Sequence, residues 1–166
     1  MRRLGSHLAT AAIIFLMFPS AALAGSFYVD VVGATQGNID GDVTGPGPVI
    51  DQIEAFELHH FVSRSRSPGA LPAHETILFT KKRLDPSTLK LIAAWDQGEL
   101  LTVTFAFCAD PSCDPLHYVI NLTGARVISI EPWTRPSDQR ERIGLVYQTI
   151  EFVFPGESNE SVTLVP

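Results

Sequence analysis

The sequence lacks the short motifs that mark common catalytic and cofactor sites. It has no glycine-rich phosphate loop between a strand and a helix, no Gly-x-Ser-x-Gly elbow, no His-Glu-x-x-His pair and no Cys/His set for zinc. Some histidines and acids could serve as catalytic groups, but their spacing does not bring them together: His59, His60, His74, His117, Asp30, Glu54 and Glu57. We therefore predict a protein that is not an enzyme and that holds no cofactor and no metal.

Basic residues are also scarce. The chain has 12 Lys and Arg against 18 Asp and Glu, which gives a net charge of −6. Because such a surface repels phosphate backbones, nucleic acid is not expected as a partner. The length of 166 residues suits one domain, and no internal repeat or long low-complexity run divides it.

The first 24 residues have the pattern of a secretory signal peptide. Arg2 and Arg3 precede an apolar run at 11–18, and small residues follow it up to Ala24. We predict cleavage between Ala24 and Gly25, which leaves an exported chain, periplasmic or secreted, with a net charge of −8. An N-terminal membrane anchor is the alternative, but the apolar run is too short to span a bilayer, so no stable membrane insertion is expected.

Only two cysteines are present, Cys108 and Cys113, and they flank the turn-forming sequence Ala-Asp-Pro-Ser. In an exported chain this arrangement favours a disulfide across a hairpin, which contributes about 2 kcal/mol on the loop-entropy model. Zinc is the alternative, but two thiolates without nearby ligands make a poor zinc site. A redox pair of the thioredoxin type needs Cys-x-x-Cys, a different spacing.

One convincing helix follows the N-terminal segment, over about 86–97. Asp85 suits the N-cap, Pro86 the first helical position, and Gly98 a left-handed stop. Four apolar residues lie together on one side of this helix, which is therefore expected to pack on a sheet: Leu89, Leu91, Ile92 and Trp95.

The rest of the chain alternates polar and apolar residues, as β-strands do. We predict strands at 27–32, 49–62 (one long strand or two bent ones), 75–82, 101–108, 117–122, 125–130 and 143–154. Polar loops are expected at 63–73 and 132–142. Trp133, in the second loop, either packs over one end of the fold or makes a contact in assembly. The tail 156–166 is either loose or a short edge strand.

Two clusters look like metal sites at first sight. His59 and His60 are neighbours on a predicted strand, where adjacent side chains point to opposite faces, so we expect structural roles for both. Asp40 and Asp42 suggest calcium, but the spacing of an EF-hand and its terminal Glu are missing.

The stretch 79–98 resembles the Hcp family, the tube-forming proteins of bacterial type VI secretion. The family pattern is a strand that ends in Phe-Thr-Lys-Lys, a Leu-Asp step, a short helix and a glycine turn before the next strand. The matching residues here are Phe79, Thr80, Lys81, Lys82, Leu84, Asp85, Lys90, Leu91 and Gly98. The likeness spans about 27–154 and implies a mainly β fold, a small two-sheet β-barrel of antiparallel strands with one short helix, as a domain at 25–155.

The resemblance also implies a function through surfaces. Family members form hexameric rings that stack into a tube, hold secreted effectors in the lumen and meet a spike protein. The expected partner is therefore the chain itself, with effectors or a spike protein as further partners. The loop with Arg64 and Arg66 is either a solvated hairpin tip or, as in the family, a contact with a neighbouring subunit. Family members assemble in the cytoplasm, so the signal peptide favours an alternative, an exported binding module that reuses the fold.

Overall fold

The computed structural model describes residues 27–44, 47–64, 72–74, 76–82, 84–108, 113, 116–135, 138–154 and 160–164. The predicted signal peptide with its Ala24–Gly25 junction lies outside these residues, as does Arg66. The predictions for these positions therefore stay predictions.

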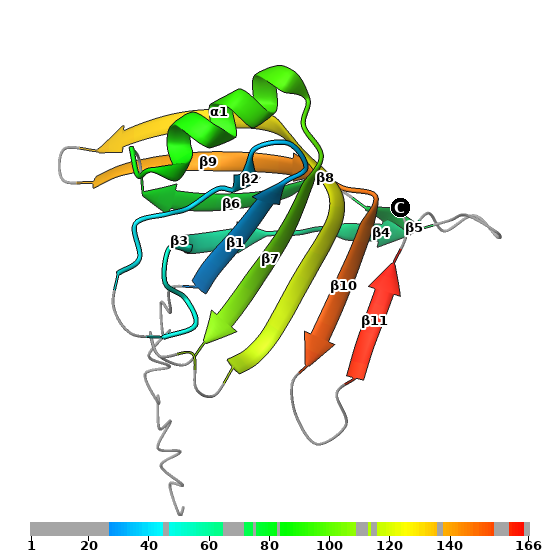
Figure 1. The fold of residues 1–166 in the computed structure, drawn as a ribbon. Coiled ribbons are helices and arrows are strands. Elements are labelled where there is room, and N and C mark those ends of the chain that lie inside the picture. The colour runs from blue at the N-terminus through cyan, green and yellow to red at the C-terminus, as the bar shows by residue number, and fades with distance from the viewer. Residues whose placement is uncertain are drawn as a thin grey trace, which may run out of the picture.

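Six strands form a closed antiparallel barrel, which confirms the barrel predicted from the sequence (Figure 1). In barrel order they are β8 (Leu116–Arg135), β7 (Leu101–Cys108), β1 (Phe27–Gly33), β3 (Ile53–His59), β6 (Ile77–Lys82) and β9 (Asp138–Val146). Pairing of β9 with β8 closes the barrel. With α1 (Ser87–Gln97) as the one helix among the described residues, the predicted fold class is confirmed.

The long strand β8 belongs to both halves of the sheet. Its first half pairs with β7 on one side and β10 (Thr149–Phe154) on the other, whereas its second half pairs with β9. Strand β11 (Glu160–Leu164) pairs with β10 and extends the sheet beyond the barrel, as Figure 1 shows. Of the two alternatives for the tail, the edge strand is therefore the one observed.

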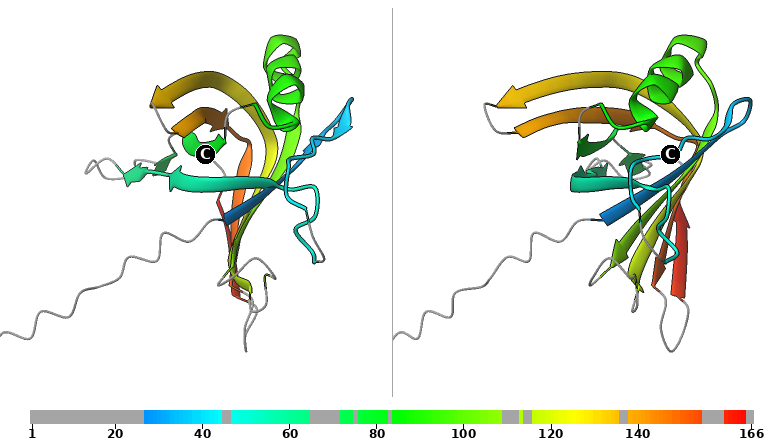
Figure 2. Two further views of the ribbon diagram at one scale, coloured as in Figure 1. Left: turned by 90° about the vertical axis from the view of Figure 1, so that its left-hand side faces the viewer. Right: turned by 60° about the vertical axis from the view of Figure 1, so that its left-hand side comes forward.

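Two small pieces complete the sheet structure. Strand β2 (Gly37–Asn38) forms a hairpin with β1, and β4 (Val62–Arg64) pairs with β5 (Pro72–His74) in a separate two-stranded sheet. Figure 2 shows this second sheet projecting from the barrel on a side away from α1.

The barrel interior is filled by alternate side chains of its strands, as the period of a strand requires. On β7, for example, Leu101, Val103 and Phe105 are buried, while Thr102 between them is exposed. The largest apolar side chains that are fully buried come from five strands of the barrel, from β10 and from the helix: Phe79, Phe105, Ile53, Ile77, Leu91, Leu101, Leu122, Ile143, Leu145, Ile150 and Val29. The helix therefore shares the core of the barrel.

The helix ends as predicted but begins one residue later. Gly98 has a left-handed conformation (φ 60°), and its amide donates to the carbonyls of the last turn, which confirms the predicted stop. Pro86 occupies the cap position, and the helix starts at Ser87. Asp85 precedes the cap, yet its Oδ1 accepts from the amide of Ser87 at 2.9 Å, as a capping carboxylate does.

Two predictions about the C-terminal part were wrong. The segment 132–142 is a hairpin of β8 and β9, with Trp133 opposite Arg140, instead of a polar loop. The alternation was hidden because polar residues occupy both faces of strands that extend past the core. The single strand predicted at 143–154 is broken at Gln148, whose amide donates to Thr123 O at 3.0 Å and turns the chain into β10.

Candidate docking surface

The apolar side of α1 that was expected to face the sheet faces solvent instead. The helix buries a narrower stripe, made of Ser87, Thr88, Leu91 and Ala94. Leu89, Ile92 and Trp95 are 76%, 41% and 51% exposed. The prediction was right for Leu91 alone. The two small polar residues can be buried because carboxylates beneath the helix accept from their hydroxyls.

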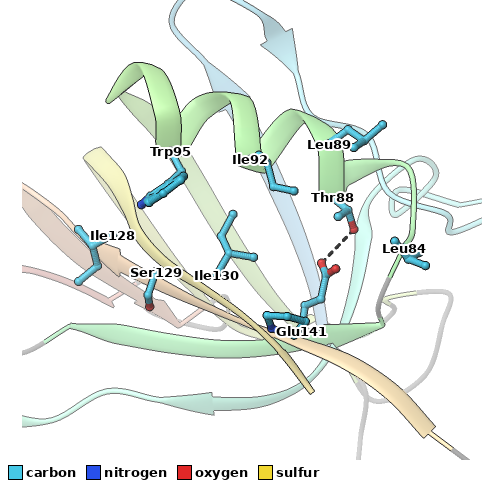
Figure 3. A pocket seen from close by; sticks show the side chains of 10 residues that line it. Leu84, Thr88, Leu89, Ile92, Trp95, Ile128, Ser129, Ile130 and Glu141 are labelled. Carbon is cyan, nitrogen blue, oxygen red and sulfur yellow. Dashed lines mark hydrogen bonds between the residues drawn. The ribbon is translucent and has the colours of Figure 1, made fainter. Parts of the chain in front are cut away.

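These exposed side chains form one wall of a groove of about 590 Å³, which we call the α1 groove. Figure 3 shows α1 along one side and strands β8 and β9 along the other. Most of its lining is apolar, with hydroxyls and one carboxylate as the polar groups: Leu84, Thr88, Leu89, Ile92, Trp95, Ile128, Ser129, Ile130, Pro132 and Glu141. The sequence analysis missed this groove because its walls come from segments about 40 residues apart.

A bulge in β8 places the opposite wall. The register between β8 and β9 shifts between Val127 and Ser129, so Ile128 is an extra residue on the β8 side. Bulges redirect side chains in this way, and Ile128 is 46% exposed in the groove. Across the bulge only glycine fits at position 144, because a Cβ there would collide with Ser129 Oγ.

Leu84, at one end of the groove, has an unusual backbone. Its φ is +60°, a left-handed conformation that costs a bulky residue roughly 1–2 kcal/mol, and its side chain is 69% exposed. A strained residue that gains no burial is more often found at functional sites than elsewhere.

A buried ion cluster lies beneath the helix. Lys81 is fully buried, and its Nζ lies 2.7 Å from Asp85 Oδ1 and 3.1 Å from Glu141 Oε2. The same Nζ donates to Thr88 Oγ1 and to Lys82 O, both at 3.0 Å. One cation therefore faces two carboxylates, and the cluster carries a formal charge of −1. Oδ2 of Asp85 is buried without a hydrogen-bond partner among the described atoms.

Glu141 connects this cluster to the groove. Its Oε2 accepts from Thr88 Oγ1 at 2.9 Å and pairs with Lys81, and the side chain also lines the groove, as Figure 3 shows. Its β9 neighbours Arg140 and Arg142 lie on the other face of the strand, where the Arg140 guanidinium stacks on Phe56 at 4.6 Å. None of the described residues that line the groove is basic.

Contacts on the far side of α1 fix its position. Lys90 Nζ donates to Asn38 O at 2.7 Å and pairs with Asp40 at 3.1 Å. Asp42 pairs with Lys82 at 2.9 Å. The two aspartates that suggested calcium are thus bound to lysines. No group of three or more potential metal ligands occurs among the described residues.

The residue after the helix stop holds the β1–β2 turn. Glu99 Oε1 accepts from the amides of Thr35 at 2.6 Å and Gln36 at 2.9 Å. Burial by itself would raise the pKa of Glu99, but the hydrogen bonds from Gln36 and Thr35 outweigh it and lower that pKa overall. Glu99 is therefore a structural carboxylate, held in its charged form.

The histidines do not converge on one site. His60 lies 2.8 Å from the hydroxyl of Tyr147, and its ring packs near Phe152. Burial raises the pKa of Tyr147 to about 12. His117 is exposed on β8, at the other end of the molecule's long strand from the α1 groove, and the side chain of His74 lies outside the described part of the chain.

The predicted cysteine and arginine sites differ in what can be described. Cys108 and Cys113 are joined in a disulfide at the end of β7, with Cα atoms 4.7 Å apart. Arg64 ends β4, opposite Pro72 of β5, and its predicted assembly contact is not tested. Within the described ranges, no helix has the length and apolar character needed to cross a bilayer.

Comparison with known proteins shows the fold. No protein-family model matches the chain, and no curated protein matches it by sequence. Among solved structures, a variant of Hcp1 from the E. coli EAEC 042 pathovar matches with a TM-score of 0.75 and 19% identity, over 84% of this chain and 98% of that one. The secreted protein Hcp3 from Pseudomonas aeruginosa matches with a TM-score of 0.68 and 22% identity, over 84% and 98%.

A third structure, a type VI secretion system effector from Yersinia pestis, matches with a TM-score of 0.65 and 12% identity, over 83% of this chain and 96% of that one. These matches cover nearly the whole of each solved chain. The barrel with its single helix is therefore the Hcp fold, as the resemblance at 79–98 implied.

Proposed function

We propose that this chain is a non-enzymatic structural protein of the Hcp type, which associates with copies of itself into hexameric rings related to the type VI secretion tube. The observation that carries the proposal is the fold, which matches Hcp structures over almost their full length. Proteins with this role act through surfaces, and no catalytic or metal-binding cluster was recognised among the described residues.

The open sheet edge supports self-association. Strand β11 stands at the end of the strand order and pairs only with β10 among the described strands. A free edge is a template for a strand of another chain. A ring also needs two different patches on each copy, because its contacts are head-to-tail. Exposed apolar side chains outside the groove, Phe61 (59% exposed) and Phe154 (54%), supply candidates for such contacts.

Light scattering coupled to size-exclusion chromatography tests this proposal on the chain that begins at Gly25. We expect a species with the mass of six chains that persists on dilution to low micromolar concentration. The oxidised and the reduced protein should be compared, because the predicted export implies an intact disulfide. A monomer at high protein concentration in both states contradicts the proposal.

We further propose that the chain is exported, to the periplasm or out of the cell, after cleavage before Gly25. The support is the pattern of residues 1–24 and a cysteine pair close enough to be joined. Cell fractionation and N-terminal sequencing of the purified protein provide the test. A cytoplasmic chain that still carries residues 1–24 would rule out export.

A second candidate function is an exported binding module that uses this fold without forming a tube. The α1 groove favours it, because an apolar surface of this size is kept open to solvent. A pull-down from periplasmic extract separates the two candidates. Recovery of type VI components alone would argue against the binding module.

A further inference from the structure

The α1 groove has the size and lining of a ligand site. Its volume of about 590 Å³ lies within the range of roughly 300–1,000 Å³ that is usual for such sites. Large apolar side chains line both walls and stay 41–76% exposed, among them Leu89, Ile92 and Trp95 on α1 and Ile128 on β8. Such a set would be costly to leave in water unless something covers it part of the time.

Local structure keeps the groove open. The helix docks on the barrel through Leu91 and Ala94, which turns its larger apolar residues away from the core. The β8 bulge turns Ile128 toward them, and Leu84 keeps a left-handed backbone at the rim. Because each feature comes from a different segment, the open shape is a property of the fold and not of one flexible side chain.

The charge in the wall selects the occupant. Lys81, Asp85 and Glu141 together carry −1, and none of the described lining residues is basic. The bonds of Glu141 among the described residues all use Oε2, which leaves Oε1 for a group in the groove. The whole chain carries −6, so a second copy is a poorer electrostatic match than a basic partner.

We propose that the α1 groove binds a peptide segment of another protein in which apolar side chains are followed by a Lys or Arg. The apolar side chains lie between Ile92 and Ile128, and the cation donates to Glu141 beside Thr88. This contact does not require ring formation, so it holds for either function proposed above.

Three synthetic peptides test the proposal. They share an acetylated segment of Leu and Ala and end in Lys-amide, norleucine-amide or Glu-amide. Trp95 reports binding by fluorescence in a Trp133→Phe background, since the chain has two tryptophans. We expect the Lys peptide to bind at least about tenfold more tightly than the Glu peptide, with the norleucine peptide between them. Equal binding of the Lys and Glu peptides would overturn the proposal.

Matched variants locate the site. Ile92→Ser should weaken all three peptides by a similar factor, whereas Ile50→Ser should weaken none, because Ile50 is 47% exposed but lies outside the groove. Glu141→Gln should remove the advantage of Lys over norleucine and leave norleucine binding unchanged. Equal effects of Ile50→Ser and Ile92→Ser would place binding elsewhere and refute the assignment.

Two further measurements keep the proposal testable if Glu141→Gln fails to fold. In the unaltered protein, added salt should weaken the Lys peptide but not the norleucine peptide, and salt-independent Lys binding contradicts the role of Glu141. Trp95 fluorescence should also stay constant as protein concentration rises without peptide. A change with concentration would assign the groove to a second copy of the chain and overturn the proposal.

Discussion

Replacing Lys81 with Met is expected to destabilise the fold severely. Lys81 is fully buried, and its Nζ is the one cation described within the cluster that holds Asp85 and Glu141. Met fills a similar volume, so the change removes the charge and its hydrogen bonds without leaving a large cavity. Two carboxylates then stay buried without a counter-ion, close to each other.

The magnitude follows from these contacts. Removing one partner of a buried ion pair costs about 3–5 kcal/mol, because the other charge stays desolvated. Lys81 serves two carboxylates at 2.7 and 3.1 Å, so we expect the upper part of this range. A domain of this size is stable by only about 5–15 kcal/mol. With a urea slope of about 2 kcal/mol per molar, the unfolding midpoint should fall by roughly 2 M.

Urea unfolding at pH 7, followed by far-ultraviolet circular dichroism at one protein concentration, measures the loss. The neighbouring residue provides the control: Lys82 pairs with Asp42, but its side chain is 61% exposed. Lys82→Met should therefore cost less than about 1 kcal/mol. If Lys81→Met costs no more than Lys82→Met, the buried cluster does not stabilise the fold as described.

Three further predictions concern the helix, the disulfide and a buried tyrosine. Leu91→Ala should cost about 2–5 kcal/mol in urea unfolding and Leu89→Ala within about 0.5, since the two residues are 1% and 76% exposed; equal losses would contradict the observed helix face. Replacing Cys108 and Cys113 together with Ser should cost about 2 kcal/mol, and an unchanged midpoint would show that the disulfide constrains nothing. Because burial raises the pKa of Tyr147 to about 12, its contribution to stability is complete below pH of about 10 and is lost as the pH rises through about 12. Tyrosinate absorbance should show this late ionisation, and Tyr147→Phe should abolish it.

The barrel and the helix stop could be predicted because local chemistry specifies them. Strands such as β7 alternate strictly, with Val103 and Phe105 inward and Thr102 outward, and a period of two allows no other structure. Gly98 follows the last helical turn, where a left-handed residue is needed. Both signals lie within a few residues of the feature that they predict.

The groove could not be predicted because it depends on which of two apolar stripes the helix buries. Leu91 and Ala94 form one stripe, and Leu89, Ile92 and Trp95 lie beside it with more apolar surface. The sequence favours the larger stripe. The smaller one is buried because Thr88 reaches Glu141, 53 residues away, and Lys81 lies beneath both. No local pattern reveals such a contact.

The hairpin at 132–142 was missed for a related reason. Its strands extend beyond the core, so neither face needs to be apolar and the alternation disappears. The pairing of β8 with β9 holds these residues in register, with Trp133 opposite Arg140 and Thr134 opposite Gln139.

The placement of β8 dictates the order in which the molecule can be completed. Strand β6 finds its second neighbour only in β9, some 60 residues later in the chain, and β1 waits as long for β7. A chain emerging from the ribosome or from a translocation pore therefore carries unmatched backbone amides until its last third arrives. Such distant pairings are slow to form, so a chaperone that shields the early strands should raise the yield of native protein.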